Sequence, residues 1–167
     1  AVWVLVWPGP CRRGRVDVRT LGGWASAQGS SALSPDRSRE LFLPYLAPLT
    51  VQSGLAYYGC CEPVHALLEL IMQAIPNLRS VSVSSWADFR RVAEMLGRQY
   101  VYSRKPNPAL ISGANPDWSL AEADMRKTYE AARDCNVELL FRDIYTIAGD
   151  RPRLARWVAM TRSTFGI

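Results

Sequence analysis

The chain has 167 residues, 49% of them hydrophobic and 21% charged, which is the composition of a soluble globular domain. This balance excludes disordered and collagen-like chains. The longest apolar run, residues 1–7, is far shorter than the roughly 20 residues that a membrane-spanning helix needs. A secretory signal peptide carries its basic residues before the apolar run, whereas here they follow it. The sequence therefore predicts a cytoplasmic protein with no membrane partner.

The net charge of +5 is unevenly distributed along the chain. Residues 1–22 carry four arginines against one aspartate, a net charge of +3, and residues 23–167 contribute only +2. No basic stripe interleaved with aromatic residues occurs, so the charge does not predict nucleic-acid binding. We interpret residues 1–22 as an irregular basic leader, either part of the protein or a mis-called start, and residues 23–167 as the folded segment.

Four cysteines are too few for a disulfide scaffold in a chain that is large enough to bury its own core. Reduced thiols in a cytoplasmic protein are therefore expected. Two of the cysteines, Cys60 and Cys61, are adjacent. This pair is either a set of small buried residues or the source of a reactive thiolate.

Helical and strand-like patterns alternate from Ser34 onward. In chain order they predict a helix over residues 34–53, a strand over 55–58, a helix over 63–75, a strand over 79–83, a helix over 88–96, a strand over 99–102, a helix over 119–135, a strand over 137–141 and a helix over 152–162. Pro44 and Pro48 are expected to kink or divide the first helix. Ser119 matches the start of a capping box, and Asp150 is the expected cap of the last helix.

Strand followed by helix, repeated four times, indicates an α/β fold with a parallel sheet and right-handed crossovers. The sheet is either open and doubly wound or part of a barrel. Neither a G-x-G-x-x-G pattern nor a P-loop occurs, so no sequence motif predicts nucleotide binding. In both architectures ligands bind at the carboxyl ends of the strands.

Polar, aromatic and thiol side chains fill the loops after the four predicted strands. These loops contribute Tyr58, Cys60, Cys61 and Glu62, then Ser84, Ser85, Trp86 and Asp88, then Arg104, Lys105 and Asn107, and finally Arg142, Asp143, Tyr145 and Thr146. Since all four loops belong to one end of the sheet, that end is the predicted pocket.

Several of these residues also have a purely structural interpretation. Asp88 is either a site residue or a carboxylate that stabilises a helix N-terminus. Arg104 and Lys105 either hold an anionic substrate group or are solvated loop residues. Asp143 either serves the site or fixes its loop through an ion pair with its neighbour. The single histidine, His65, is expected to be structural.

Six ordered strings carry a family resemblance. They are Leu33-Ser34-Pro35, Tyr58-Gly59-Cys60-Cys61-Glu62-Pro63, Ile75-Pro76-Asn77-Leu78-Arg79, Ser82-Val83-Ser84-Ser85-Trp86-Ala87-Asp88, Lys105-Pro106-Asn107-Pro108-Ala109 and Arg142-Asp143-Ile144-Tyr145-Thr146. Together they resemble the carboxyl-terminal part of the uroporphyrinogen decarboxylase-like superfamily, which has a (β/α)8 TIM barrel. The resemblance implies that residues 23–167 form a partial (β/α)8 TIM barrel of about four parallel strand–helix units.

The superfamily includes tetrapyrrole decarboxylases and corrinoid-dependent methyltransferases. In the methyltransferase branch a histidine and a cysteine after the corresponding strand hold zinc. Cys60 matches that cysteine, whereas Tyr58 stands in the place of the histidine. The resemblance therefore implies a variant zinc site with Cys60 and Glu62 as ligands, joined by Asp143.

The favoured interpretation is a methyltransferase-type member that moves a methyl group between a corrinoid or a methylated small molecule and a thiol. Its predicted catalytic residues are Cys60, Glu62 and Asp143, and its predicted substrate-binding residues are Tyr58, Trp86, Arg104, Lys105, Asn107 and Tyr145. Zinc and a corrinoid are the implied cofactors, and a corrinoid protein is a candidate partner. Tetrapyrrole decarboxylation is one alternative, and an inactive partial barrel that serves as a binding module is the other. An opened half-barrel exposes apolar strand flanks, so self-association is also predicted.

Overall fold

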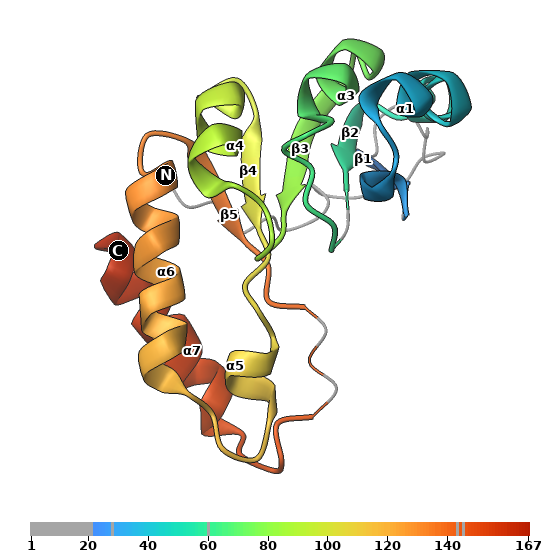
Figure 1. Ribbon diagram of the computed structural model, residues 1–167. Coiled ribbons are helices and arrows are strands. Elements are labelled where there is room, and N and C mark those ends of the chain that lie inside the picture. Colours follow the sequence, from blue (N-terminus) through green and yellow to red (C-terminus); the bar gives the residue numbers. More distant parts are fainter. Residues whose placement is uncertain (1–21, 28, 60, 143, 145) are drawn as a thin grey trace, which may run out of the picture.

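A five-stranded parallel sheet forms the centre of the fold in the computed structural model, which describes residues 22–167 except 28, 60, 143 and 145 (Figure 1). The strands are β1 (Gly22–Ala25), β2 (Leu55–Tyr58), β3 (Leu78–Val83), β4 (Val101–Arg104) and β5 (Asn136–Leu139). Each pairs in parallel with the next, so the order in the sheet is the order in the chain.

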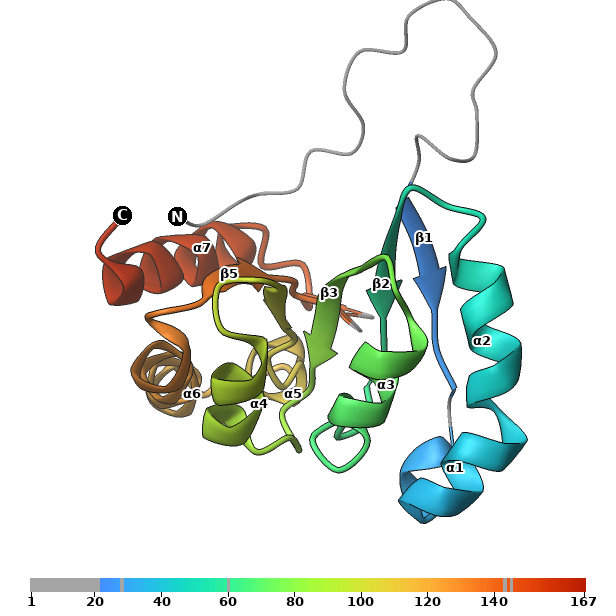
Figure 2. The same ribbon diagram turned by 90° about the horizontal axis from the view of Figure 1, so that it is seen from above.

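The sequential strand order distinguishes between the two architectures that the sequence left open. A doubly wound sheet reverses its strand order at a switch point and carries helices on both faces. Here the order never reverses. The helices α2 (Leu43–Thr50), α3 (Leu68–Ala74) and α4 (Phe89–Leu96) lie along one face of β1, β2 and β3 (Figure 2). An α/β fold of this kind is consistent with part of a barrel-like sheet.

All four predicted strands are present, although three differ from their predicted bounds by one or two residues. The strand predicted over residues 55–58 is β2, and the one predicted over residues 99–102 begins two residues later as β4. The sequence predicted about four parallel strands, and the structure adds a fifth, β1, before them. Its sequence, Gly-Gly-Trp-Ala, lacks the β-branched residues that indicate a strand.

The first predicted helix is divided into α1 (Pro35–Leu41) and α2 (Leu43–Thr50). Ser34 caps α1, accepting a hydrogen bond from the Arg37 N–H at 3.3 Å. The break falls at Phe42, whose φ of −133° is not helical. Pro44 therefore lies in the first turn of α2, where its missing N–H costs nothing.

The next helix, α3 (Leu68–Ala74), begins five residues later than predicted. Pro63 opens a turn-containing segment instead, so the start predicted at Pro63 was wrong. In contrast, α4 (Phe89–Leu96) matches its prediction closely. Asp88 caps it by accepting from the Arg91 N–H at 3.1 Å.

Two long helices, α6 (Trp118–Ala132) and α7 (Pro152–Phe165), pack beside each other, and the short α5 (Ala109–Ser112) precedes them (Figure 1). Asp117 caps α6, accepting from the Leu120 N–H at 3.0 Å, so the predicted cap at Ser119 was wrong. Asp150 does not cap α7 but approaches Arg153 with an Nε to Oδ2 distance of 3.4 Å.

The main core lies between the sheet and the helices α2, α3 and α4. Its most completely buried side chains include Leu68, Ile71, Ile75, Val81, Val83, Val92, Leu96 and Tyr102. A smaller cluster of Ile111, Ala121, Met125 and Trp157 joins α5, α6 and α7. On α7, Trp157 and Thr161 are buried, whereas Leu154 and Val158 are 40% and 46% exposed. Within the described part of the chain, no helix combines the length and apolar character needed to cross a membrane.

Candidate functional site

The two faces of the sheet differ in chemistry. Successive residues of a strand point to opposite faces, and Val81, Val83 and Tyr102 belong to the core under the helices. The residues between them lie on the other face. We call this the polar face and define it by Tyr57, Ser80, Ser82, Ser103 and Glu138.

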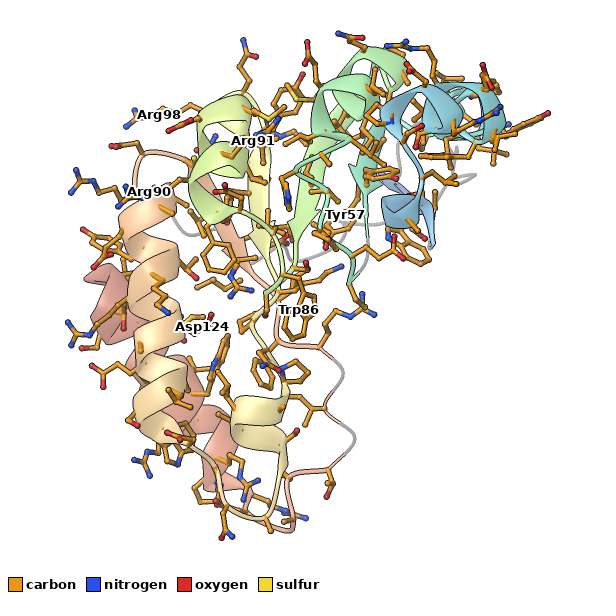
Figure 3. All side chains as sticks on the ribbon, in the orientation of Figure 1. Tyr57, Trp86, Arg90, Arg91, Arg98 and Asp124 are labelled. Carbon is orange, nitrogen blue, oxygen red and sulfur yellow. The ribbon has the colours of Figure 1, made fainter. Side chains whose placement is uncertain are left out.

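A row of polar side chains crosses this face near the carboxyl ends of the strands. Ser82 on β3 pairs in register with Ser103 on β4, which pairs with Glu138 on β5. The Tyr57 hydroxyl from β2 lies 3.2 Å from the Ser103 Oγ, and either atom can donate the hydrogen bond. Figure 3 shows Tyr57 and Trp86 at the end of the sheet nearest α5, which follows β4.

Glu138 is the most unusual member of the row. Its side chain is only 3% exposed, and its Oε2 atom has no hydrogen-bond partner among the described residues. The Ser80 Oγ is also buried without a described partner. Buried polar groups are nearly always hydrogen-bonded, and buried charges are nearly always paired. The polar face therefore has a carboxylate oxygen and a serine hydroxyl that can accept hydrogen bonds from a bound donor group.

Burial and neighbouring charges set the protonation of Tyr57. Burial raises the pKa of its hydroxyl above the usual 10, while hydrogen bonds with Ser103 and Ser82 oppose that rise. The negative charge of Glu138 raises the Tyr57 pKa further, and the positive charge of Arg142 lowers it. The net effect keeps Tyr57 protonated at neutral pH, so it can donate a hydrogen bond as well as accept one.

Lys105 lies just beyond the row, at the end of β4. Its backbone N–H donates to the Val83 carbonyl at 2.9 Å, which continues the ladder between β3 and β4 past the strand ends. Its ammonium group stands 5.2 Å from the centre of the Tyr57 ring, within the range of a cation–π interaction. Among the predicted substrate-binding residues that the structure describes, Lys105 is the one that reaches the polar face.

Arg104 points in the opposite direction, into the layer between the sheet and α6. Its Nη2 atom donates to both carboxylate oxygens of Asp124, at 2.7 and 2.9 Å, and its Nε donates to the Thr128 Oγ1 at 3.1 Å. Its Nη1 donates to the Ser85 Oγ at 3.3 Å and to the Lys105 carbonyl. All five N–H groups of this fully buried side chain thus have protein partners. In this arrangement Arg104 fixes β4 to α6 and has no donor left for a substrate anion.

Tyr58 and Glu62 lie on the side of the sheet that carries the helices. Tyr58 is 3% exposed and belongs to the main core, because it has the opposite phase from Tyr57 on β2. The Glu62 Oε1 atom accepts a hydrogen bond from the Gly29 N–H at 2.5 Å, linking the loops after β1 and β2. Both side chains line a small cavity with Gly59 and Leu67.

The remaining rim residues are divided between structural and exposed positions. Trp86 is 70% exposed at the carboxyl end of β3. The Asn107 Oδ1 atom accepts from the Ala109 N–H at 3.0 Å and so begins α5. The Nδ1 atom of His65 accepts from the Asp88 N–H at 3.2 Å, which agrees with the structural role expected for the histidine.

Three predicted site residues, Cys60, Asp143 and Tyr145, lie outside the described residues. Among the residues that are described, no three His, Cys, Asp or Glu side chains come together as a metal site would require. Because Cys60 and Asp143 lie outside the described residues, the zinc site stays a prediction, and we derive no chemical step through zinc.

Four residues of the row were not predicted from the sequence, namely Tyr57, Ser82, Ser103 and Glu138. A signal for them was available, since parallel strands covered on both faces are usually continuous apolar runs. The run Ser80-Val81-Ser82-Val83 alternates instead, and Glu138 interrupts the apolar run of β5. Such alternation indicates that one face of the sheet is polar.

No family model, curated protein or solved structure that was compared with this chain matches it. The function must therefore be inferred from the geometry of the site and from the residues themselves.

Proposed function

We propose that this chain is a uroporphyrinogen decarboxylase-like protein of the methyltransferase type, in which the five strands form part of a (β/α)8 TIM barrel. The sequential parallel order of the strands supports this architecture. The observation that carries the functional proposal is the buried polar row with the unpartnered Glu138 carboxylate oxygen. In barrels of this kind the interior residues at the carboxyl ends of the strands act on the substrate.

The reaction is methyl transfer from a corrinoid or a methylated small molecule to a thiol. The thiol first loses its proton, because the thiolate is the nucleophile. The sulfur electron pair then forms the new bond to carbon, and the leaving group keeps the electron pair of the broken bond. The thiol proton passes to solvent water. The Glu138 carboxylate is the proposed acceptor for a donor group of the substrate, and the Tyr57 hydroxyl is the proposed hydrogen-bond donor to it.

Tetrapyrrole decarboxylation is the second candidate, and the basic residues near the polar face favour it. Lys105 stands over the Tyr57 ring, and the charge of Arg142 is near enough to lower the Tyr57 pKa. Positively charged groups at this position suit the acidic side chains of a porphyrinogen. A partial barrel that binds such a ligand without catalysis is the third candidate.

Absorbance titration of the purified chain separates these functions. With methylcobalamin and 2-mercaptoethanol, the methyltransferase proposal predicts a saturable change in the corrinoid spectrum and formation of the methyl thioether. Glu138→Gln should slow thioether formation at least tenfold, whereas the exposed Glu130→Gln should leave it unchanged.

A titration with uroporphyrin provides the comparison. Binding of uroporphyrin without any response to methylcobalamin would overturn the methyltransferase proposal in favour of a tetrapyrrole function. A failure to bind either compound would favour the inactive partial barrel. Metal analysis of the wild type and Cys60→Ser tests the zinc prediction separately, and zinc absent from both proteins would reject it.

A further inference from the structure

The polar face offers a buried negative charge in surroundings built from hydrogen-bonding groups. Glu138 is 3% exposed on β5 and lies in register with Ser103, whose hydroxyl contacts the Tyr57 hydroxyl at 3.2 Å. The Ser80 Oγ on the same face is also unpartnered among the described residues. A carboxylate in such a position is strongly disfavoured unless a positive donor meets it.

We propose that Glu138 receives a protonated amine of the ligand, so that the polar face recognises an ammonium-bearing small molecule. An ammonium group donates up to three hydrogen bonds and carries one positive charge. It therefore satisfies the free carboxylate oxygen and also has a donor for a serine hydroxyl. The inference rests on the proposed function only for the position of the ligand on the polar face. It adds the chemical class of that ligand.

The position of Lys105 determines the orientation of such a ligand. Lys105 follows β4 directly, and its ammonium group stands 5.2 Å from the centre of the Tyr57 ring on the polar face. Glu138 stands at the level of Ser103. The ammonium end of the ligand is therefore directed toward Glu138, and its other end, next to the Lys105 ammonium group, is neutral or anionic.

Small probes of equal length test the proposal. In thermal unfolding and calorimetric titration of the full chain, n-butylammonium at millimolar concentration should raise the Tm and bind measurably. The neutral n-butanol and the anionic n-butyrate should do neither. Glu138→Gln should weaken n-butylammonium binding at least tenfold, while Glu130→Gln on the exposed surface of α6 should bind as the wild type does.

The stability of the variant without ligand gives a second measurement. Because Gln has nearly the same shape but no charge, Glu138→Gln should unfold at the same or a higher temperature than the wild type. Unfolding at a clearly lower temperature would overturn the proposal, because Glu138 would then be a structural partner of Lys105 or Arg142.

Other binding outcomes also contradict the proposal. Equal binding of n-butanol, no binding of n-butylammonium, or stabilisation by Zn²⁺ or Mg²⁺ alone that depends on Glu138 would each overturn it. None of these measurements uses a corrinoid or a thiol. Amine binding in the absence of methyl transfer would therefore reject the proposed function while supporting the inference, and the reverse result would reject only the inference.

Discussion

At the scale of single residues, Arg104 shows how burial determines what a charged side chain does. Its guanidinium group lies 4.3 Å from the centre of the Phe89 ring and forms two hydrogen bonds with the Asp124 carboxylate. Side chains from β4, α4 and α6 therefore meet around one cation. A guanidinium group in such a position is a structural tie, because moving it toward a ligand would leave Asp124 without its counter-charge.

Arg104→Met should destabilise the fold by about 3 kcal/mol, since removal of one partner leaves a buried charge uncompensated. Denaturant unfolding followed by circular dichroism measures this change. The matched control is Arg126→Met, which removes the exposed Arg126–Glu122 pair and should cost less than about 0.5 kcal/mol. A stable Arg104→Met protein that had lost ligand binding would instead restore the predicted anion-binding role.

Tyr57 predicts a pH dependence at the alkaline end. Burial raises the pKa of Tyr57 in the folded state above its value of 10 in the unfolded chain. The folded protein therefore keeps a proton that the unfolded chain loses, so this contribution to stability is complete below pH 10 and declines as the pH rises further. The difference in unfolding free energy between wild type and Tyr57→Phe should shrink above that pH. Urea titrations up to pH 11 measure this difference, because only about a tenth of an ordinary phenol is still protonated at that pH. A difference in unfolding free energy that stays constant up to pH 11 would contradict the burial of Tyr57.

At the scale of elements, the turn after β2 brings the backbone of Gly59 into close contact with the polar face. Gly59 has a φ of +111°, its N–H donates to the Ala25 carbonyl at 2.9 Å, and its carbonyl accepts from the Trp24 Nε1 at 2.9 Å. A Cβ atom at this position would stand 2.8 Å from the Cβ of Ser82. Glycine is needed there both for its backbone conformation and for the close approach to the serine row.

Gly59→Ala should therefore destabilise the protein more than Gly97→Ala. Both glycines have positive φ, but a Cβ atom at Gly97 would meet nothing within 4 Å. The backbone strain costs about 1–2 kcal/mol at either site, and the contact with Ser82 adds about 1–3 kcal/mol at Gly59. Thermal unfolding of the two variants measures the difference, and equal losses would show that the contact with Ser82 is relieved by a small shift.

The helix caps show which local signals the sequence carries and which it leaves ambiguous. Asp88 and Ser34 were predictable, because a short polar side chain directly precedes each helix and accepts one of its free N–H groups. At α6 two suitable residues stand close together. Asp117 holds the cap and also accepts a hydrogen bond from the Ser119 Oγ at 2.8 Å, so the cap lies two residues earlier than the capping box indicated.

At the scale of the whole molecule, the sheet has two edges. Among the described strands, β1 pairs only with β2, and β5 pairs only with β4. Apolar side chains are exposed beside the β1 edge, among them Trp24 at 66% and Tyr45 at 70%. Leu41, Tyr45 and Leu49 follow one another at four-residue intervals along α1 and α2 and are all exposed. Unpaired strand edges and apolar stripes of this kind favour association.

We expect the chain to self-associate as its concentration rises. Sedimentation velocity from micromolar to hundreds of micromolar protein should show a rising apparent mass. The double variant Tyr45→Lys and Leu49→Lys should reduce the rise, whereas Leu120→Lys, an exposed apolar position on α6, should not. A constant monomer mass over the whole range would contradict the prediction.

The sequence by itself determined the alternation of strands and helices, because the spacing of apolar residues and the helix-starting residues are local signals. It also predicted the end of the sheet at which Lys105 and Trp86 lie. Only the tertiary structure decided which strand face each residue occupies. Neighbouring residues of a strand point to opposite faces of the sheet. The buried Tyr58 therefore lies on the other face from Tyr57, and Arg104 lies on the other face from Ser103. The partners of Arg104, and the lack of a partner for the Glu138 Oε2 atom among the described residues, depend on elements distant in the chain, so local patterns carry no information about them.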